Sequence, residues 1–140
     1  MIPTENRRQS ARIVSGVLAG VAAAMATIAV LEAVNGMIFP LPAIDWSDAE
    51  AVRRVMLVVP LAAQLMMIAG WLLGALVGSG LAVAIGRRAW AGWFPAGSVV
   101  MGGVFNALLI AHPWWMNVGA VLAPVAGGAI GIALARRRVV

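Results

Sequence analysis

The sequence contains no cysteine, one histidine and very few charged residues. The absence of cysteine excludes disulfides, thiolate chemistry and haem attachment through cysteine. The histidine and the five carboxylates lack the spacing of a zinc or di-iron site, and no nucleophile–base pair is visible. We therefore expect a protein that is not an enzyme and that carries no metal and no cofactor.

Apolar residues dominate instead. They make up 63% of the chain, charged residues make up 11%, and the mean hydropathy is +0.98. This leaves too little polar surface to coat a soluble globule. The composition predicts an all-α polytopic membrane protein whose first partner is the lipid bilayer.

Four apolar runs are long enough to cross a bilayer as helices. They cover residues 13–35, 60–86, 93–111 and 117–135, and they predict one four-helix membrane domain over 1–140. A secretory signal is the alternative for the first run, since Arg7-Arg8 precedes it and Ala24-Met25-Ala26 resembles a cleavage site. The run continues well past that site, which favours a spanning helix.

The net charge of +5 comes from arginine alone, and the arginines flank the apolar runs. Eight of the ten fall on one predicted side: Arg7, Arg8, Arg12, Arg87, Arg88, Arg136, Arg137 and Arg138. This asymmetry predicts that both termini lie in the cytoplasm. Because the arginines mark topology and form no stripe with aromatic residues, we do not expect nucleic-acid binding.

The first outer loop, residues 36–59, predicts a short extra helix. Ser47-Asp48-Ala49-Glu50 has the S-x-x-E form of a capping box, in which Ser47 and Glu50 satisfy free backbone N–H groups, so the helix should begin at about Asp48. Glu50 and Arg54 are spaced for a weak surface pair. Val59 precedes Pro60, which predicts a break. The loop helix either lies at the interface or extends the second span.

Small residues recur every four positions in three of the spans. Such ridges let helix backbones approach closely in lipid. The predicted packing ridges are Gly16 and Gly20 in the first span, Gly70, Gly74 and Gly78 in the second, and Gly119, Gly127 and Gly131 in the fourth.

Polar residues in the spans gather at one predicted depth, in the outer half of the membrane. Glu32, Gln64, Asn106 and His112 form this layer, and we treat them as a candidate ligand or ion site. The structural alternative is that Glu32 is protonated or hydrogen-bonded to Asn106, Gln64 or water and fixes the register of the bundle. Asn106 also continues the line Ser98-Gly102, which predicts that this line faces another helix.

Helix angles predict a partner surface on the first span. At about 100° per residue, Glu32 points nearly opposite the stripe Gly16-Gly20-Ala23-Thr27. If the stripe packs inside the bundle, Glu32 must face another subunit, a bound molecule or the headgroups. If Glu32 faces Gln64 and Asn106, the stripe is free for an oligomer contact.

Three features together resemble a family. They are an acid before a proline-containing loop, Gly70-Trp71-x-x-Gly74, and Asn106 followed by His112-Pro113-x-Trp115. Over nearly the whole chain this arrangement resembles a group of uncharacterised small four-span bacterial inner-membrane proteins. The resemblance implies four spans and no particular activity.

Three function classes remain open. The first is a non-enzymatic membrane component that self-associates or joins a larger complex, which the density of ridges favours. The second is a small proton- or cation-coupled transporter or channel that uses Glu32. The third is an outer-leaflet binder of a lipid, quinone or pigment, anchored by Glu32 or His112. Its predicted walls are Trp71, Phe105, Met66 and Met67.

Overall fold

A computed structural model describes residues 4–45, 47–110 and 112–139. The chain forms the helices α1 (Thr4–Ile38), α2 (Ala49–Val58), α3 (Leu61–Gly86), η1 (Ala89–Gly92, a 3₁₀ turn), α4 (Trp93–Leu109) and α5 (Trp114–Val139). No strand occurs among the described residues, so the all-α prediction is confirmed. Four helical segments are long and apolar enough to cross a membrane: Glu5–Ile38, Leu61–Gly86, Ala89–Leu109 and Trp114–Arg137.

Several helix ends differ from the predicted ends. α1 begins at Thr4 and not near residue 13, because the polar residues before the apolar run continue the same helix. α5 begins at Trp114, directly after Pro113. The predicted end of the third span, Ala111, lies outside the described residues, and α4 ends at Leu109.

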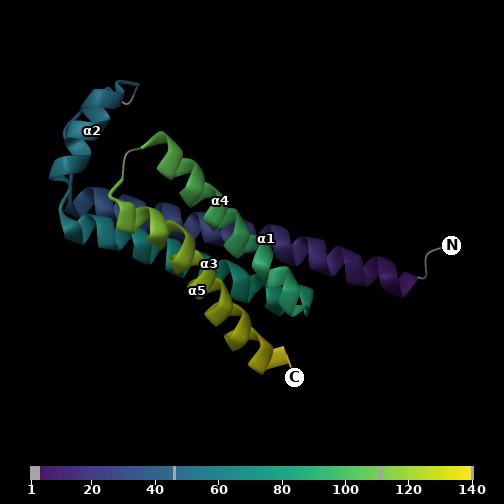
Figure 1. Cartoon of the computed structure of the whole chain (residues 1–140). Helices are drawn as coiled ribbons and strands as arrows, with labels where there is room; N and C mark the ends of the chain where they lie inside the picture. The colour runs from purple at the N-terminus through teal and green to yellow at the C-terminus, as the bar shows by residue number, and fades with distance from the viewer. Residues whose placement is uncertain (1–3, 46, 111, 140) are drawn as a thin grey trace.

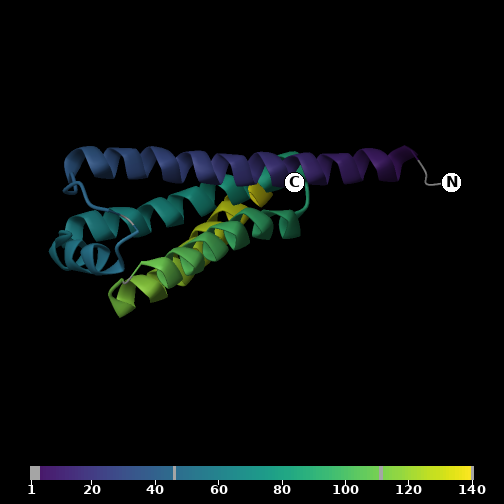
Figure 2. The ribbon, with the colours of Figure 1, turned by 90° about the horizontal axis from the view of Figure 1, so that it is seen from above.

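α3 is the central helix of the bundle. α1 packs along one side of α3 and α5 along another, while α4 packs mainly on α5 and also touches α3 and α1 (Figure 1). The start of α1, the end of α5 and η1 lie at one end of the bundle, which we call the terminal end. α2 lies at the opposite end, the α2 end, where the helices diverge (Figure 2).

Glycines bring α1 and α3 into backbone contact. A Cβ atom at Gly20 would lie 2.5 Å from the backbone oxygen of Gly78, and a Cβ at Gly78 would lie 2.5 Å from that of Gly20. Gly16 faces the backbone of Ala82 and Gly86 in the same way, at 2.8 and 2.9 Å. Any side chain at these positions would separate the two helices.

Two glycines of α5 make the equivalent approach on another side of α3. Gly127 lies against the backbone of Leu72, and Gly131 lies against that of Leu76. The three remaining ridge glycines meet side chains across a helix interface. Gly70 faces Leu31, Gly74 faces Ile28, and Gly119 faces Ile68.

The main core cluster gathers around α3. Its buried members are Ala24, Trp71, Ala75, Ala96, Val99 and Ala120, and Ile28, Met67 and Ile68 pack against it. Most of these side chains are small, so the core is filled by helices that lie close together and not by large side chains. A second cluster of Val83, Ile132 and Ala135 lies nearer the terminal end.

The glycine stripe of α1 packs inside the chain, so it is not free for an oligomer contact. Beyond Ala24 the contact face of α1 continues through Ile28, Leu31 and Asn35, each of which touches α3. Glu32 directly follows Leu31 and therefore lies at the edge of this face. The glycine stripe that predicts Glu32 on the opposite side lies in the earlier part of α1. The face that contacts α3 turns gradually along the helix, so Glu32 comes to lie beside this face.

The line Ser98-Gly102-Asn106 is not the packing face of α4. A Cβ atom at Gly102 would meet nothing within 4 Å, whereas one at Gly103 would lie 3.0 Å from the backbone oxygen of Ala120. Val99 is buried beside Gly103 on this face. The predicted line is therefore wrong at Gly102, one residue from the packing face and rotated by about 100°, although the side-chain oxygen of Asn106 is buried.

Candidate functional site

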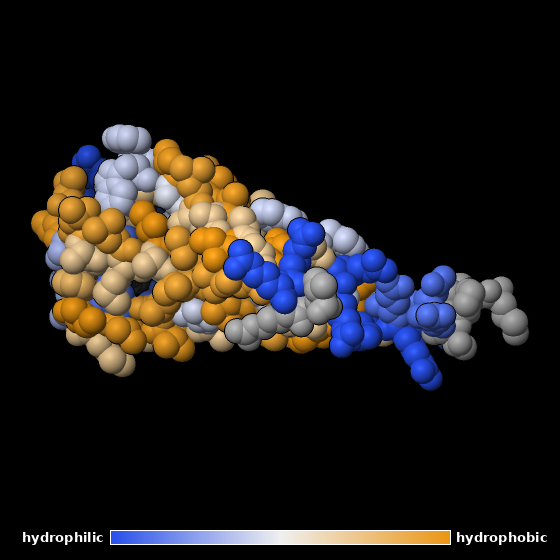
Figure 3. Space-filling view, turned by 90° about the horizontal axis from the view of Figure 1, so that it is seen from below, coloured by the Kyte–Doolittle hydropathy of each residue, from blue (hydrophilic) through white to orange (hydrophobic). Residues whose placement is uncertain are grey.

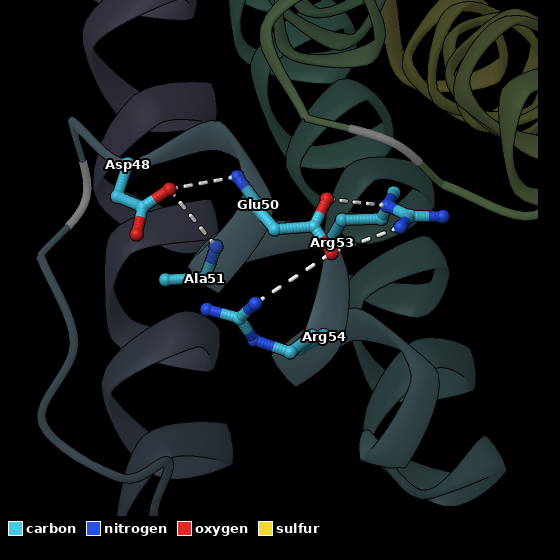
Figure 4. A network of polar contacts seen from close by, with 5 residues as sticks. All are labelled: Asp48, Glu50, Ala51, Arg53 and Arg54. Carbon is cyan, nitrogen blue, oxygen red and sulfur yellow. Dashed lines mark hydrogen bonds and ion pairs between the residues drawn. The ribbon is translucent and has the colours of Figure 1, made fainter.

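α2 begins at a cap that Asp48 provides (Figure 4). Oδ1 of Asp48 accepts hydrogen bonds from the backbone N–H groups of Glu50 and Ala51, at 2.9 and 3.2 Å. The predicted capping box is wrong, because the Ser47 hydroxyl donates to Asp45 at 2.7 Å. Ser47 and Asp48 are both residue types that favour the N-cap position. Because the Ser47 hydroxyl is hydrogen-bonded to Asp45, Asp48 caps the helix.

Glu50 pairs forward along α2. Its carboxylate accepts from Nη2 of Arg53 at 2.9 Å and lies 3.6 Å from Nη1 of Arg54. The predicted Glu50–Arg54 pair is therefore confirmed, and Arg53 is the stronger partner. These contacts hold the pKa of Glu50 below its usual range, mainly through the Arg53 hydrogen bond.

The chain turns sharply between α2 and α3. Val59 is extended (φ −62°, ψ 122°), α2 ends at Val58 and α3 starts at Leu61, so the predicted break at Pro60 is confirmed. α2 runs across the axis of α3 and does not extend it (Figures 1 and 2). The break frees backbone carbonyls, and Gln64 Nε2 donates to that of Val59 at 3.2 Å.

A cavity of about 430 Å³ opens at the α2 end, between α1, α2, α3 and the start of α5. Most of its wall is apolar. Phe39 and Leu41 come from the α1–α2 connection, Met56 from α2, Met67 from α3 and Met116 from α5. Unbranched methionine side chains adapt to ligands of varied shape, so three of them make this wall adaptable.

Four polar residues also line the cavity: Glu32, Asn35, Gln64 and His112. Three of them donate to backbone carbonyls. Asn35 Nδ2 donates to Ala63 at 3.1 Å, Gln64 Nε2 donates to Val59, and His112 Nδ1 lies 2.9 Å from the carbonyl oxygen of Ile110. Because a carbonyl only accepts, His112 carries its proton on Nδ1.

The acceptors of the same residues have no partner within the part of the chain that the structure describes. Asn35 Oδ1 is fully buried and unpaired. No hydrogen bond from described residues reaches the Glu32 carboxylate, Gln64 Oε1 or His112 Nε2. For the buried Asn35 Oδ1 the missing hydrogen bond costs about 1–3 kcal/mol, whereas Glu32 is exposed. The cavity therefore presents acceptors to whatever occupies it.

The surroundings of His112 favour its neutral form. Its burial lowers the pKa of the imidazolium, and the Ile110 carbonyl offsets this only in part. The neutral ring with its proton on Nδ1 keeps Nε2 as an acceptor. His112 thus belongs to the acceptor set of the cavity.

The structure brings three of the four predicted site residues together. Glu32, Gln64 and His112 line the cavity, whereas Asn106 lies in the last turn of α4 outside its lining. The hydrogen bonds proposed between Glu32 and Asn106 or Gln64 are not made among described residues. Asn35 was missed as a site residue, although it lies one turn beyond Glu32 on the same helix.

Most of the predicted wall residues lie elsewhere. Of the four, only Met67 lines the cavity. Trp71 is buried in the core, and Phe105 is 64% exposed on α4. Three of the apolar wall residues, Phe39, Leu41 and Met56, come from the loop and from α2, whose placement the apolar pattern does not encode.

No family model, curated protein or solved structure matches this chain. The resemblance to small four-span bacterial proteins therefore stays a prediction.

Proposed function

We propose that this chain is a non-enzymatic integral membrane protein whose cavity at the α2 end binds one amphipathic molecule. The observation that carries the proposal is an apolar cavity whose polar residues present unpaired acceptors. Ligand sites are commonly apolar hollows with a few convergent polar groups. Lipids and quinols, the reduced form of quinones, are the classes that combine an apolar body with one polar head.

The acceptor set selects the chemistry of the head. The Glu32 carboxylate, Asn35 Oδ1 and His112 Nε2 all need a donor, so the ligand head carries an amine or hydroxyl group. Glu32 carries two carboxyl oxygens and is the main anchor of the head, with each hydrogen bond contributing about 0.5–1.5 kcal/mol. A ligand head that carries only acceptors is disfavoured.

Membrane placement is part of the proposal. Four segments long and apolar enough to span support it, as does the arginine asymmetry between the two ends. The proposed location is a bacterial inner membrane with both termini in the cytoplasm and the α2 end outside. The cavity then opens at the outer leaflet.

The test is native mass spectrometry of the full chain purified in mild detergent. We expect one bound amphipathic species with an amine or hydroxyl head. Glu32→Gln should weaken its retention about tenfold, because one of the two acceptor oxygens is replaced by an amide donor. Met56→Trp should displace it by filling the cavity.

Met101→Trp is the matched control. Met101 is 69% exposed on α4, away from the cavity, so this change should leave retention unaltered. Equal retention in Glu32→Gln, Met56→Trp and Met101→Trp would show that any bound molecule lies on the outer surface, and it would refute the cavity as the site.

A second candidate function is self-association through α1. Only 17% of the apolar window of α1 is buried, against 44% for α3. The exposed side of α1 carries Ala22, Ala26, Ala29 and Ala33 at intervals of three or four residues, a small-residue face of the kind that helices pair on. A larger complex could use the same face.

This candidate has its own test. Gly16→Leu and Gly20→Leu do not probe it, because both glycines pack on α3. Ala26→Leu with Ala29→Leu should instead convert an oligomer to a monomer in mild detergent, measured by analytical ultracentrifugation. Ala129→Leu with Ala133→Leu, at exposed positions of α5, is the control. A monomeric starting protein would exclude the candidate.

A further inference from the structure

The terminal end holds a second hollow, of different chemistry. It measures about 300 Å³ and lies between the start of α1 and the turn after α3. Its lining is polar and consists of Glu5, Arg8, Gln9, Arg12, Gly86, Arg87 and Arg88. Four arginines and one glutamate therefore share one small space.

The local backbone brings these arginines together. Arg8 and Arg12 are one turn apart on α1. Gly86 lets the end of α3 approach α1, because its Cβ position lies only 3.4 Å from Cα of Ile13. Arg87 then adopts a left-handed conformation (φ 52°, ψ 31°), and its N–H donates to the carbonyl of Val83. The chain thus turns at the point where α1 is close.

Arg88 is held by a side chain of α1. With the Gln9 amide turned so that its oxygen faces Arg88, it accepts from Nε of Arg88 at 2.9 Å and also from Nη2. The remaining N–H groups of the Arg88 guanidinium stay available. Gln9 therefore positions Arg88 without neutralising its charge.

Glu5 also lines the hollow, but in the described part of the chain it makes no ion pair with the four arginines. Across the described ranges, the only ion pairs are those of Glu50 at the opposite end. Guanidinium groups that share a hollow repel one another unless an anion joins them. Their planar forks match phosphate oxygens in pairs.

The hollow also lies at the depth of a headgroup layer. Arg12 directly precedes the apolar run of α1, and Arg87 directly follows α3. Trp90 and Trp93, next along the chain, are 53% and 47% exposed, as is typical of aromatic residues at a membrane interface. Hydrophilic residues gather toward this end of the surface, beside the apolar body (Figure 3).

We propose that this hollow binds one phosphate group, supplied by the headgroup of an anionic phospholipid. Arg12 on α1 and Arg88 in the turn after α3 donate hydrogen bonds to the phosphate, while Arg8 and Arg87 add positive charge beside it. The inference rests on the membrane placement proposed above, and it is independent of the cavity at the α2 end. Basic pockets between spans on the cytoplasmic side are suited to such headgroups.

The test compares lipid retention by the full chain in detergent. Phosphatidylglycerol and phosphatidylcholine are added in parallel to delipidated protein, and bound lipid is measured by native mass spectrometry. We expect phosphatidylglycerol to be retained in preference to phosphatidylcholine. Arg12→Gln with Arg88→Gln should weaken its retention at least about tenfold, because two basic contacts are lost.

Two double variants serve as controls. Arg136→Gln with Arg137→Gln removes two charges at the same end but outside the hollow, and Arg53→Gln with Arg54→Gln removes two at the other end. Both should retain phosphatidylglycerol as the parent chain does. An equal loss in the Arg136/Arg137 variant would show diffuse attraction and overturn the site.

Three further measurements separate the outcomes. Arg12→Lys with Arg88→Lys keeps the charge and loses the forks, so it should bind with intermediate affinity; this variant also decides the matter if the glutamine variant does not fold. Full retention in the lysine variant would contradict the forked contact.

Displacement of the lipid by inorganic phosphate at a similar concentration would identify free phosphate as the ligand and overturn the lipid assignment. Failure of the chain to enter lipid nanodiscs would instead refute the membrane placement.

Discussion

The two ends of the bundle are built on opposite principles. Toward the terminal end, α1, α3 and α5 touch backbone to backbone through Gly16, Gly20 and Gly131. At the α2 end the same helices diverge, Pro60 breaks the chain, and a cavity of about 430 Å³ remains. Glycine contacts thus fix the helices at one end and leave room for a ligand at the other.

The polar residues follow the same division. Near the middle of the bundle the α1–α3 contact is made by glycine and alanine. At the α2 end it is made by Asn35, which donates to the carbonyl of Ala63.

The glycine contacts should show the largest response to mutation. Gly78→Ala places a Cβ atom 2.5 Å from the backbone oxygen of Gly20, so we expect a loss of about 3 kcal/mol in the free energy of unfolding. Unfolding in a denaturing detergent series measures it. Gly102→Ala is the control, since its Cβ meets nothing within 4 Å, and it should be neutral or raise stability by up to about 1 kcal/mol. Equal effects of the two changes would contradict the contact.

The cap of α2 should show a smaller and local response. Asp48→Ala removes the acceptor for two backbone N–H groups and should destabilise α2 by about 1 kcal/mol. Faster hydrogen exchange of the amides of residues 50–55 measures this. Ser47→Ala should leave those amides unchanged, because Ser47 pairs with Asp45. The opposite ranking of the two variants would restore the capping box.

The pH dependence of the α2 end should be smaller still. The folded state lowers the pKa of His112, so its contribution to stability is present above the ordinary value of about 6.5 and is lost as pH falls toward the folded value. Glu32 lines the same cavity, and His112→Gln separates the two residues. Because the chain has one histidine, an NMR titration of the imidazole reports it directly. A midpoint above about 6.5 would contradict the burial.

The surface pairs of α2 should show no effect. Arg53→Gln and Arg54→Gln break ion pairs between fully solvated side chains, which rarely add measurable stability. The midpoint of unfolding should not move in either variant. A clear drop would mean that α2 is held by these charges and not by its buried residues Val52 and Val55.

The fold was more predictable from the sequence than the site. Helix spans follow from continuous apolar runs, and glycines spaced by four mark faces that can approach closely, as at Gly74 and Gly127. The angle between α2 and α3 depends on the backbone at Val59, and composition does not encode that angle. This angle sets where α2 and the loop before it lie, and so brings Met56 and Leu41 to the cavity. The predicted wall residues were wrong for this reason.

The predicted depth in the membrane could not show which polar residues line the cavity. Glu32, Gln64 and Asn106 were predicted at similar depths, but depth does not say which way a side chain faces. Asn106 lies outside the cavity lining, whereas Asn35 lies inside it. The Asp48 cap shows the same limit on a smaller scale, since adjacent Ser47 and Asp48 were equally suited to it and only the Asp45 turn distinguishes them.

The most direct test of the ligand-binding account is native mass spectrometry of the parent chain beside Glu32→Gln. The account predicts one bound amphipathic molecule with an amine or hydroxyl head, retained about tenfold more weakly by the variant. A parent chain that carries no such molecule, or one retained equally by both proteins, would contradict it.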